Sequence, residues 1–69
     1  MFFIDKNVGQ PLYEQLYGQI VQQILSGQLP AGEKLPATRS LAKELSVGRN
    51  TVDKAYQQLK DEGYVTSSS

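Results

Sequence analysis

The feature that most constrains this chain is a pair of short amphipathic segments within residues 35–59, separated only by Ser46-Val47-Gly48. In the second segment the apolar residues follow the i, i+3, i+4, i+7 spacing of one buried helix face. The apolar positions are Leu41, Ala42 and Leu45 in the first segment, and Val52, Ala55, Tyr56 and Leu59 in the second. Because so short a break is too tight for a linker, the pattern predicts a helix-turn-helix.

The rest of the chain predicts one longer helix and several irregular segments. Apolar residues recur every four positions from Leu12 to Ile24, so we expect a first helix over residues 11–26, with Pro11 in its first turn and Gly27 ending it. Residues 1–10 read as a short strand or an extended arm followed by a loop. In the loop after Gly27, Leu29 and Leu35 are expected to pack back onto the core.

The ends of the other two helices follow from capping residues and helix breakers. We expect the second helix over residues 38–45, with Thr38 as the better cap by chemistry. The third, the expected recognition helix, covers residues 49–62, with Gly48 as N-cap and Gly63 ending it. Residues 64–69 begin with strand chemistry in Tyr64-Val65-Thr66. Since a terminal strand needs a partner, we expect residues 1–69 to be a single domain from a longer protein.

Composition excludes several classes of protein. The 69 residues contain no cysteine and no histidine, which excludes a disulfide scaffold and any metal site built on sulfur or imidazole, and which suits the cytoplasm. No apolar run approaches the roughly 20 residues of a membrane span, so no membrane partner is expected. A chain without histidine or cysteine offers only scattered acids for catalysis, so we expect no enzyme and no catalytic or metal-binding residues.

The distribution of charge favours a nucleic-acid partner, although the net charge is zero. Between residues 35 and 52, Arg39, Lys43 and Arg49 stand against Glu44 alone. A local basic face is sufficient for a single DNA-reading module. Side chains on the far side of the third helix from its apolar face, or flanking its first turn, are available for hydrogen bonds: Arg49, Asn50, Thr51, Asp53, Lys54 and Gln57.

Taken together, the motifs resemble the winged helix-turn-helix domain of the GntR family of bacterial transcription regulators. The resemblance covers residues 11–66 and rests on many residues at fixed spacing. They are Pro11-Leu12-Tyr13, Gln15, Gly27-Gln28-Leu29, Gly32-Glu33-Lys34-Leu35-Pro36, Arg39, Leu41-Ala42, Leu45, Val47, Arg49, Thr51-Val52, Ala55-Tyr56, Leu59 and Glu62-Gly63-Tyr64. The resemblance implies a mainly α fold of three helices with a short β wing, here incomplete because the chain stops before the family's Gly-x-Gly wing tip.

Within the family, the sequence most resembles that of the MocR branch, and the short YtrA-like branch is the alternative. In the MocR branch a linker tethers the reader domain to a large domain that resembles aminotransferases and binds pyridoxal phosphate. No cofactor is expected within residues 1–69, and pyridoxal phosphate would belong to that missing C-terminal domain. The resemblance also implies sequence-specific binding of double-stranded DNA by a cytoplasmic transcription factor that is a homodimer at full length.

Carried over position by position, the family's DNA contacts fall on both helices of the motif. Arg39 and Arg49 match arginines that reach bases or phosphates, and Thr51 matches a threonine that binds phosphate. Gly48 replaces a frequent serine or threonine, so its backbone N–H remains available but the hydroxyl is lost. Ala37 replaces a frequent serine, and Ser46 replaces a frequent glycine.

The remaining candidates follow from general recognition chemistry. Arginine presents a planar fork to guanine, and Asn50 and Gln57 could read adenine or bind phosphate. Lys43 and Lys54 suit contacts to the DNA backbone. Asp53 repels phosphate, so either it accepts from cytosine or it orients a neighbouring lysine or arginine.

Several of these residues also have a purely structural interpretation. The arginines could pair with Glu44 or Asp53 as surface cations, although the motif favours DNA contacts. Tyr13, Tyr17 and Tyr56 are expected to pack in the core or an interface, and the series Gln15, Gln19, Gln22 and Gln23 is expected to form a solvated helix face. A winged-helix domain that docks a protein partner is the alternative function, and its binding would be insensitive to salt.

Overall fold

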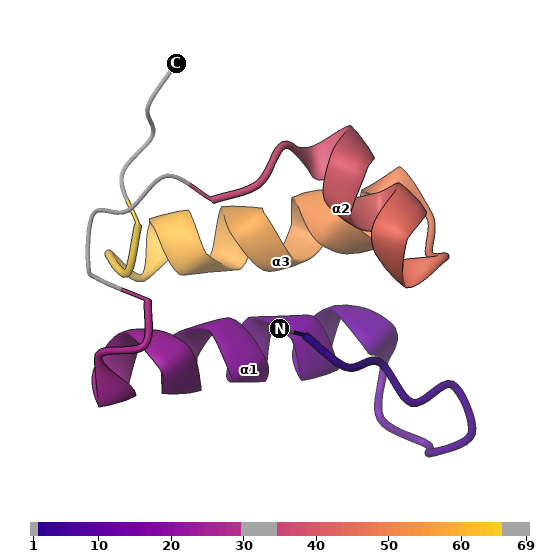
Figure 1. The fold of residues 1–69 in the computed structure, drawn as a ribbon, viewed down its shortest axis with the longest axis horizontal. Coiled ribbons are helices and arrows are strands. Elements are labelled where there is room, and N and C mark those ends of the chain that lie inside the picture. The colour runs from indigo at the N-terminus through magenta and orange to yellow at the C-terminus, as the bar shows by residue number, and fades with distance from the viewer. Residues whose placement is uncertain (1, 30–34, 66–69) are drawn as a thin grey trace.

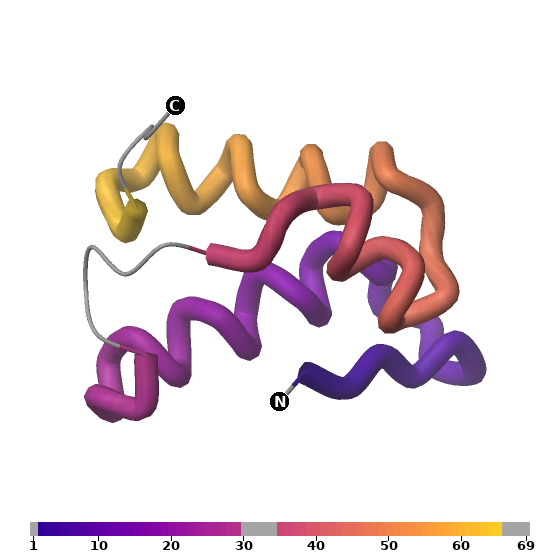
Figure 2. Tube along the Cα trace, turned by 45° about the horizontal axis from the view of Figure 1, so that its top comes forward, coloured from indigo at the N-terminus to yellow at the C-terminus, as the bar shows by residue number. Residues whose placement is uncertain are grey.

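The computed structural model describes residues 2–29 and 35–65, which form three helices. Helix α1 spans Leu12–Ser26, α2 spans Thr38–Leu45 and α3 spans Arg49–Asp61. Helices α1 and α3 lie side by side and run in the same direction, and the shorter α2 packs on α3 (Figures 1 and 2). The expected mainly α, three-helix architecture is confirmed.

The core lies where the apolar faces of all three helices meet. Burying one such side chain contributes about 1.5–3 kcal/mol. Leu29 and Leu35 pack against this core, as expected. The fully or nearly fully buried residues are Phe2, Leu16, Ile20, Leu41, Ala42, Val52, Ala55 and Leu59.

The predicted start of α1 needs correction by one residue, whereas α2 spans the predicted residues 38–45 and only its predicted cap differs. Pro11 is the N-cap of α1 and not its first helical residue, since its ψ of 145° is extended and its carbonyl accepts from the Glu14 and Gln15 N–H groups. At α2 the N-cap is Ala37, and Thr38 already has helical geometry. Neither cap residue makes a side-chain hydrogen bond to the helix. The preference for threonine over alanine as a capping residue therefore did not decide where α2 begins.

The helix ends depend on left-handed residues. Gly27 follows α1 with φ 85°, and Gly63 follows α3 with φ 84°. Residue Glu62 is the C-cap of α3, so the recognition helix ends at Asp61, one residue earlier than predicted. The Gly63 and Tyr64 N–H groups donate to the Lys60 and Leu59 carbonyls, the paired bonds of a Schellman motif.

The N-terminal arm is extended and lies along α1 (Figure 2). Phe2 enters the core, while the Phe3 N–H donates to Gln19 Oε1 (2.7 Å) and the Gln19 amide donates back to the Phe3 carbonyl. One turn earlier, Gln15 Oε1 accepts from the Asp5 N–H (2.8 Å) and its amide donates to the Asp5 carbonyl (3.0 Å). The expectation of a solvated face is therefore wrong for Gln15 and Gln19. Their side-chain amides pair with the backbone N–H and C=O groups of the arm, as a neighbouring strand would.

The start of the wing does not form a strand in the described residues. Tyr64 and Val65 are half-buried bends, and the Tyr64 ring meets the Tyr17 ring edge to face, with centroids 6.5 Å apart. Strand pairing needs a partner strand, and residues 2–29 and 35–65 contain none. The other residues of the predicted wing, 66–69, lie outside the described part of the chain.

Candidate nucleic-acid interface

The turn between α2 and α3 sets the direction in which α3 presents its polar face. The Ser46 N–H donates to the Lys43 carbonyl and the Val47 N–H to the Ala42 carbonyl, which closes α2 with a Schellman motif. Gly48 then caps α3 with extended geometry. Because the apolar faces of both helices enter one buried cluster, the opposite face of α3 is exposed.

On α2, both predicted cations are exposed and available. Arg39 and Lys43 are four residues apart, so they share one face of the helix. Within residues 2–29 and 35–65, neither forms an ion pair or a side-chain hydrogen bond, and the same is true of Arg49. Surface pairing of Arg39 or Arg49 with Glu44 or Asp53 is therefore not seen in the described part of the chain.

The first turn of α3 has the properties of an anion site. Gly48 makes no side-chain capping bond, and the first N–H groups of any helix lack partners within it. Arg49 and Asn50 are exposed beside these groups. Thr51 is half-buried, and its N–H donates to the Gly48 carbonyl (3.1 Å). As far as the chain is described, the N-terminus of α3 therefore combines two polar side chains that have no partner with the backbone N–H groups of its first turn.

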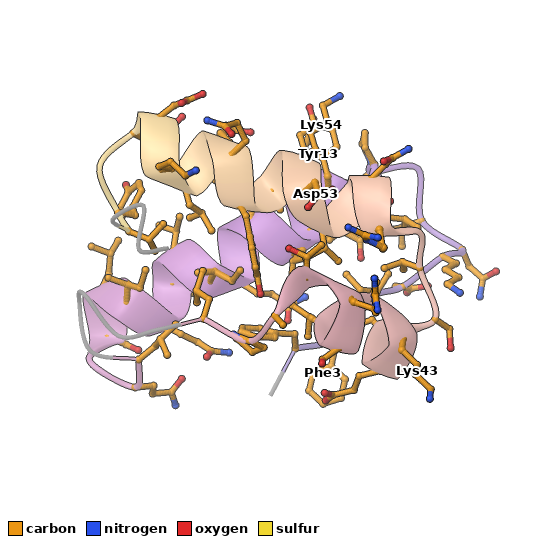
Figure 3. All side chains as sticks on the ribbon, turned by 90° about the horizontal axis from the view of Figure 1, so that it is seen from above. Phe3, Tyr13, Lys43, Asp53 and Lys54 are labelled. Atoms are coloured by element: carbon orange, nitrogen blue, oxygen red, sulfur yellow. The ribbon has the colours of Figure 1, made fainter. Side chains whose placement is uncertain are left out.

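Further along α3 the predicted residues are partly engaged elsewhere. Lys54 Nζ lies 4.2 Å from the centroid of the Tyr13 ring on α1, a cation–π contact at one edge of α3 (Figure 3). The Gln57 amide donates to Asp61 Oδ1 (2.9 Å) along the same helix. Asp53 is exposed, and no lysine or arginine of the described residues pairs with it. The structure thus gives no support for Asp53 as an orienting group.

Two residues next to this face were absent from the predicted set. Tyr13 positions Lys54, and Lys6 of the arm donates from Nζ to the Ser46 carbonyl (2.6 Å) in the turn of the motif. Residue spacing gives no signal for either contact, because each joins segments far apart in the sequence. The fold alone brings them to the interface.

The other tyrosines support the scaffold, as expected. The Tyr56 hydroxyl donates to the Pro36 carbonyl (2.8 Å), and burial raises the pKa of Tyr56 to about 12. Tyr17 donates to the Glu62 carboxylate, and this hydrogen bond raises the pKa of Tyr17 to about 12. Glu62 also accepts from the Gln58 amide (3.2 Å), so these contacts tie α1 to the end of α3.

Nothing in the described residues suggests a different kind of site. No group of three or more acidic residues is arranged to hold a metal ion there. Among the helices described, none is long and apolar enough to cross a membrane.

Comparisons with known proteins identify the family. Residues 12–69 match the family model described as bacterial regulatory proteins, gntR family. The probable rhizopine catabolism regulatory protein MocR of Rhizobium meliloti is 42% identical over 69 residues, which are 100% of this chain and 14% of MocR. The HTH-type transcriptional repressor YtrA of Bacillus subtilis is 40% identical over 65 residues, 94% of this chain and 50% of YtrA.

A solved structure supports the same family assignment. YtrA from Sulfolobus acidocaldarius, described as a GntR-family transcription factor, superimposes with a TM-score of 0.89 at 43% identity, covering 94% of this chain and 69% of that one. The chain spans only 14% of MocR and about half of the Bacillus YtrA. By name, these relatives are a regulatory protein, a transcriptional repressor and a transcription factor. The chain belongs to the gntR family of bacterial regulatory proteins, as a helix-turn-helix domain of a transcription regulator.

Proposed function

We propose that this domain reads a specific sequence in double-stranded DNA by placing the N-terminus of α3 in the major groove. The observation that supports this most is the set of exposed polar side chains on α2 and the first turn of α3 that have no partner among the described residues: Arg39, Lys43, Arg49 and Asn50. A recognition helix reads base edges with the residues of its first turns. The family match supports the same role.

Each residue would have a distinct task. Arg49 would offer its fork to guanine O6 and N7, and Asn50 would pair with adenine. Arg39 would reach a base or a phosphate from α2. The backbone contacts would come from Lys43, from Lys54 after it leaves the Tyr13 ring, from the Thr51 hydroxyl and from the Gly48 N–H. Since a cation–π contact at an exposed site is worth only about 0.5–1 kcal/mol, Tyr13 would not prevent this movement of Lys54.

Asp53 and Gln57 would act further along the groove. Asp53 would accept a hydrogen bond from cytosine N4, and its negative charge would disfavour contact with a phosphate. Gln57 would have to exchange Asp61 for an adenine or a phosphate, and this exchange would lower its contribution.

Selection of a preferred duplex from a random library, followed by affinity measurements on variants, tests this function. Arg49→Ala should weaken binding to the selected duplex by about 1–3 kcal/mol and relax the preference at one base pair. Arg49→Lys is the matched control, because it keeps the charge and loses the fork. It should retain affinity for arbitrary duplexes while losing the base preference. If Arg49→Ala leaves both affinity and preference unchanged, the base-reading role is wrong.

For the whole protein we propose the MocR-like arrangement, in which a larger C-terminal domain resembling an aminotransferase binds pyridoxal phosphate. The match to MocR over the full length of the chain supports it, and the matches to the YtrA proteins support the shorter alternative. The regulator would act as a cytoplasmic homodimer that presents two reader domains to two half-sites. Purifying the full-length polypeptide and measuring its mass, its oligomeric state and any bound pyridoxal phosphate separates the two arrangements.

A protein-docking domain is the alternative function. The exposed Phe3 side chain, 79% accessible, and Leu25, 73% accessible, are the observations that favour it. In that case partner binding would be insensitive to salt, whereas DNA affinity falls steeply as salt rises.

A further inference from the structure

The N-terminal arm brings a cation to the turn of the helix-turn-helix motif. Lys6 Nζ donates to the Ser46 carbonyl at 2.6 Å, although the two residues are 40 positions apart. In both views of the chain, the turn that follows the arm lies at the same end of the molecule as the turn between α2 and α3 (Figures 1 and 2). Lys6 therefore lies beside the N-terminus of α3.

The contact is preorganised by the arm itself. Phe2 is buried in the core, and Gln19 and Gln15 bind the backbone of Phe3 and Asp5 from α1. Asp5 Oδ1 then accepts from the Asn7 N–H (2.9 Å), which closes a tight turn around Lys6. An ammonium has three donors, so two remain after the bond to Ser46.

The local charge points to an anionic ligand. Ser46 lies three residues after Lys43 and three residues before Arg49, so Lys6 adds a positive charge to a segment of the motif that already carries two cations. Asp5 and Glu44 are the acids nearest in sequence, and no ion pair links any of the three cations to a carboxylate in residues 2–29 and 35–65. Like charges held together repel unless an anion neutralises them.

We propose that Lys6 is a further DNA contact: its ammonium, oriented by the Ser46 carbonyl, binds a backbone phosphate next to the bases that α3 reads. The arm would then belong to the interface and not only to the scaffold. A contact of this kind holds the register of the protein on the duplex and carries no sequence information. The inference rests on the proposed function, since it needs a duplex docked at α3.

The salt dependence of binding to an arbitrary duplex tests the contact. A labelled duplex is titrated with the unaltered protein and with Lys6→Met over a series of salt concentrations. Each phosphate neutralised in duplex DNA contributes about 0.9 to the slope of log affinity against log salt. Lys6→Met should reduce the magnitude of this slope by about that amount, and Lys6→Arg should restore it.

Lys60→Met is the matched control. It removes the same charge from an exposed lysine in the last turn of α3, far along the helix from Ser46. Its slope should equal that of the unaltered protein. Denaturant unfolding of each variant confirms that the proteins compared are folded.

Two outcomes would overturn the inference and are distinct. If Lys6→Met and Lys60→Met have the same slope, whatever their stability, then Lys6 serves only to satisfy the end of α2. If the unaltered protein shows no salt-dependent binding to any duplex, the proposed function itself fails, and the contact with it.

Discussion

Ser46 shows how one residue bears the geometry of the whole motif. Its φ of 58° and ψ of 45° lie in the left-handed region, and it is the one non-glycine residue with positive φ in the described part of the chain. An L-residue in this conformation costs roughly 1–2 kcal/mol. The cost is tolerated because the same turn closes α2 with two backbone hydrogen bonds.

Ser46→Gly should therefore stabilise the protein. Glycine adopts positive φ without a Cβ clash, which removes the strain of the folded state. Glycine also has more conformational freedom in the unfolded chain, which opposes folding, so the net gain in stability should be about 0.5–1 kcal/mol. The free energy of unfolding from urea titration measures it. Ser40→Gly, within α2 itself, is the control, and it should destabilise by about as much, because its position is helical. A loss of stability in Ser46→Gly would show that the serine side chain has a role of its own.

At the level of elements, the arm and α1 behave as one unit. Gln15 and Gln19 are one helical turn apart, and each offers an acceptor and a donor to alternate residues of the extended arm. A neighbouring strand would satisfy these backbone groups in the same way. The sequence of residues 1–10 was therefore compatible with either a short strand or an extended arm. Through Lys6, the arm also connects α1 to the turn between α2 and α3.

Gln19→Met should release the arm while keeping the length of the side chain. Loss of the two bonds to Phe3 should cost about 1–2 kcal/mol and should increase hydrogen exchange at the Phe3 N–H. Gln22→Met is the control, because Gln22 is exposed on α1 and makes no hydrogen bond in the part of the chain described here. Equal exchange at Phe3 in both variants would contradict the role assigned to Gln19.

For the whole molecule, the small core limits stability, and the uneven distribution of charged residues governs binding. A domain of this size rarely gains more than about 3–5 kcal/mol from its core, so a single buried leucine matters to all three helices. The net charge of zero conceals three cations near one turn, where the proposed ligand is an anion. Distribution and not total charge therefore decides what such a domain can bind.

Leu16→Ala should unfold most of the protein at room temperature. Leu16 is 0% exposed at the centre of the core, and removing a buried leucine costs about 2–5 kcal/mol, comparable with the whole stability expected here. Far-UV circular dichroism and denaturant titration measure the loss. Leu25→Ala on the same helix is the control, because Leu25 is 73% exposed, and it should change stability by less than about 0.5 kcal/mol. A folded Leu16→Ala variant would mean that the core is not shared in this way.

The sequence by itself determined the three helices, most of their core residues and the face of α3 that carries Arg49 and Asn50. These depend on the 3.6-residue period of apolar side chains and on glycine at helix ends, which are local properties. The start of α1, the N-cap of α2 and the end of α3 were each one residue off, because capping differences of about 1 kcal/mol are easily outweighed by loop geometry.

Only the tertiary structure decided how the arm docks and which partners Lys6 and Lys54 find. Gln19 meets Phe3, Lys54 meets Tyr13 and Lys6 meets Ser46 across distant parts of the chain. No local period encodes such contacts, since they arise when the buried core sets the angle and distance between the helices. The composition of the candidate interface therefore followed from the sequence, while its position beside the arm followed from packing.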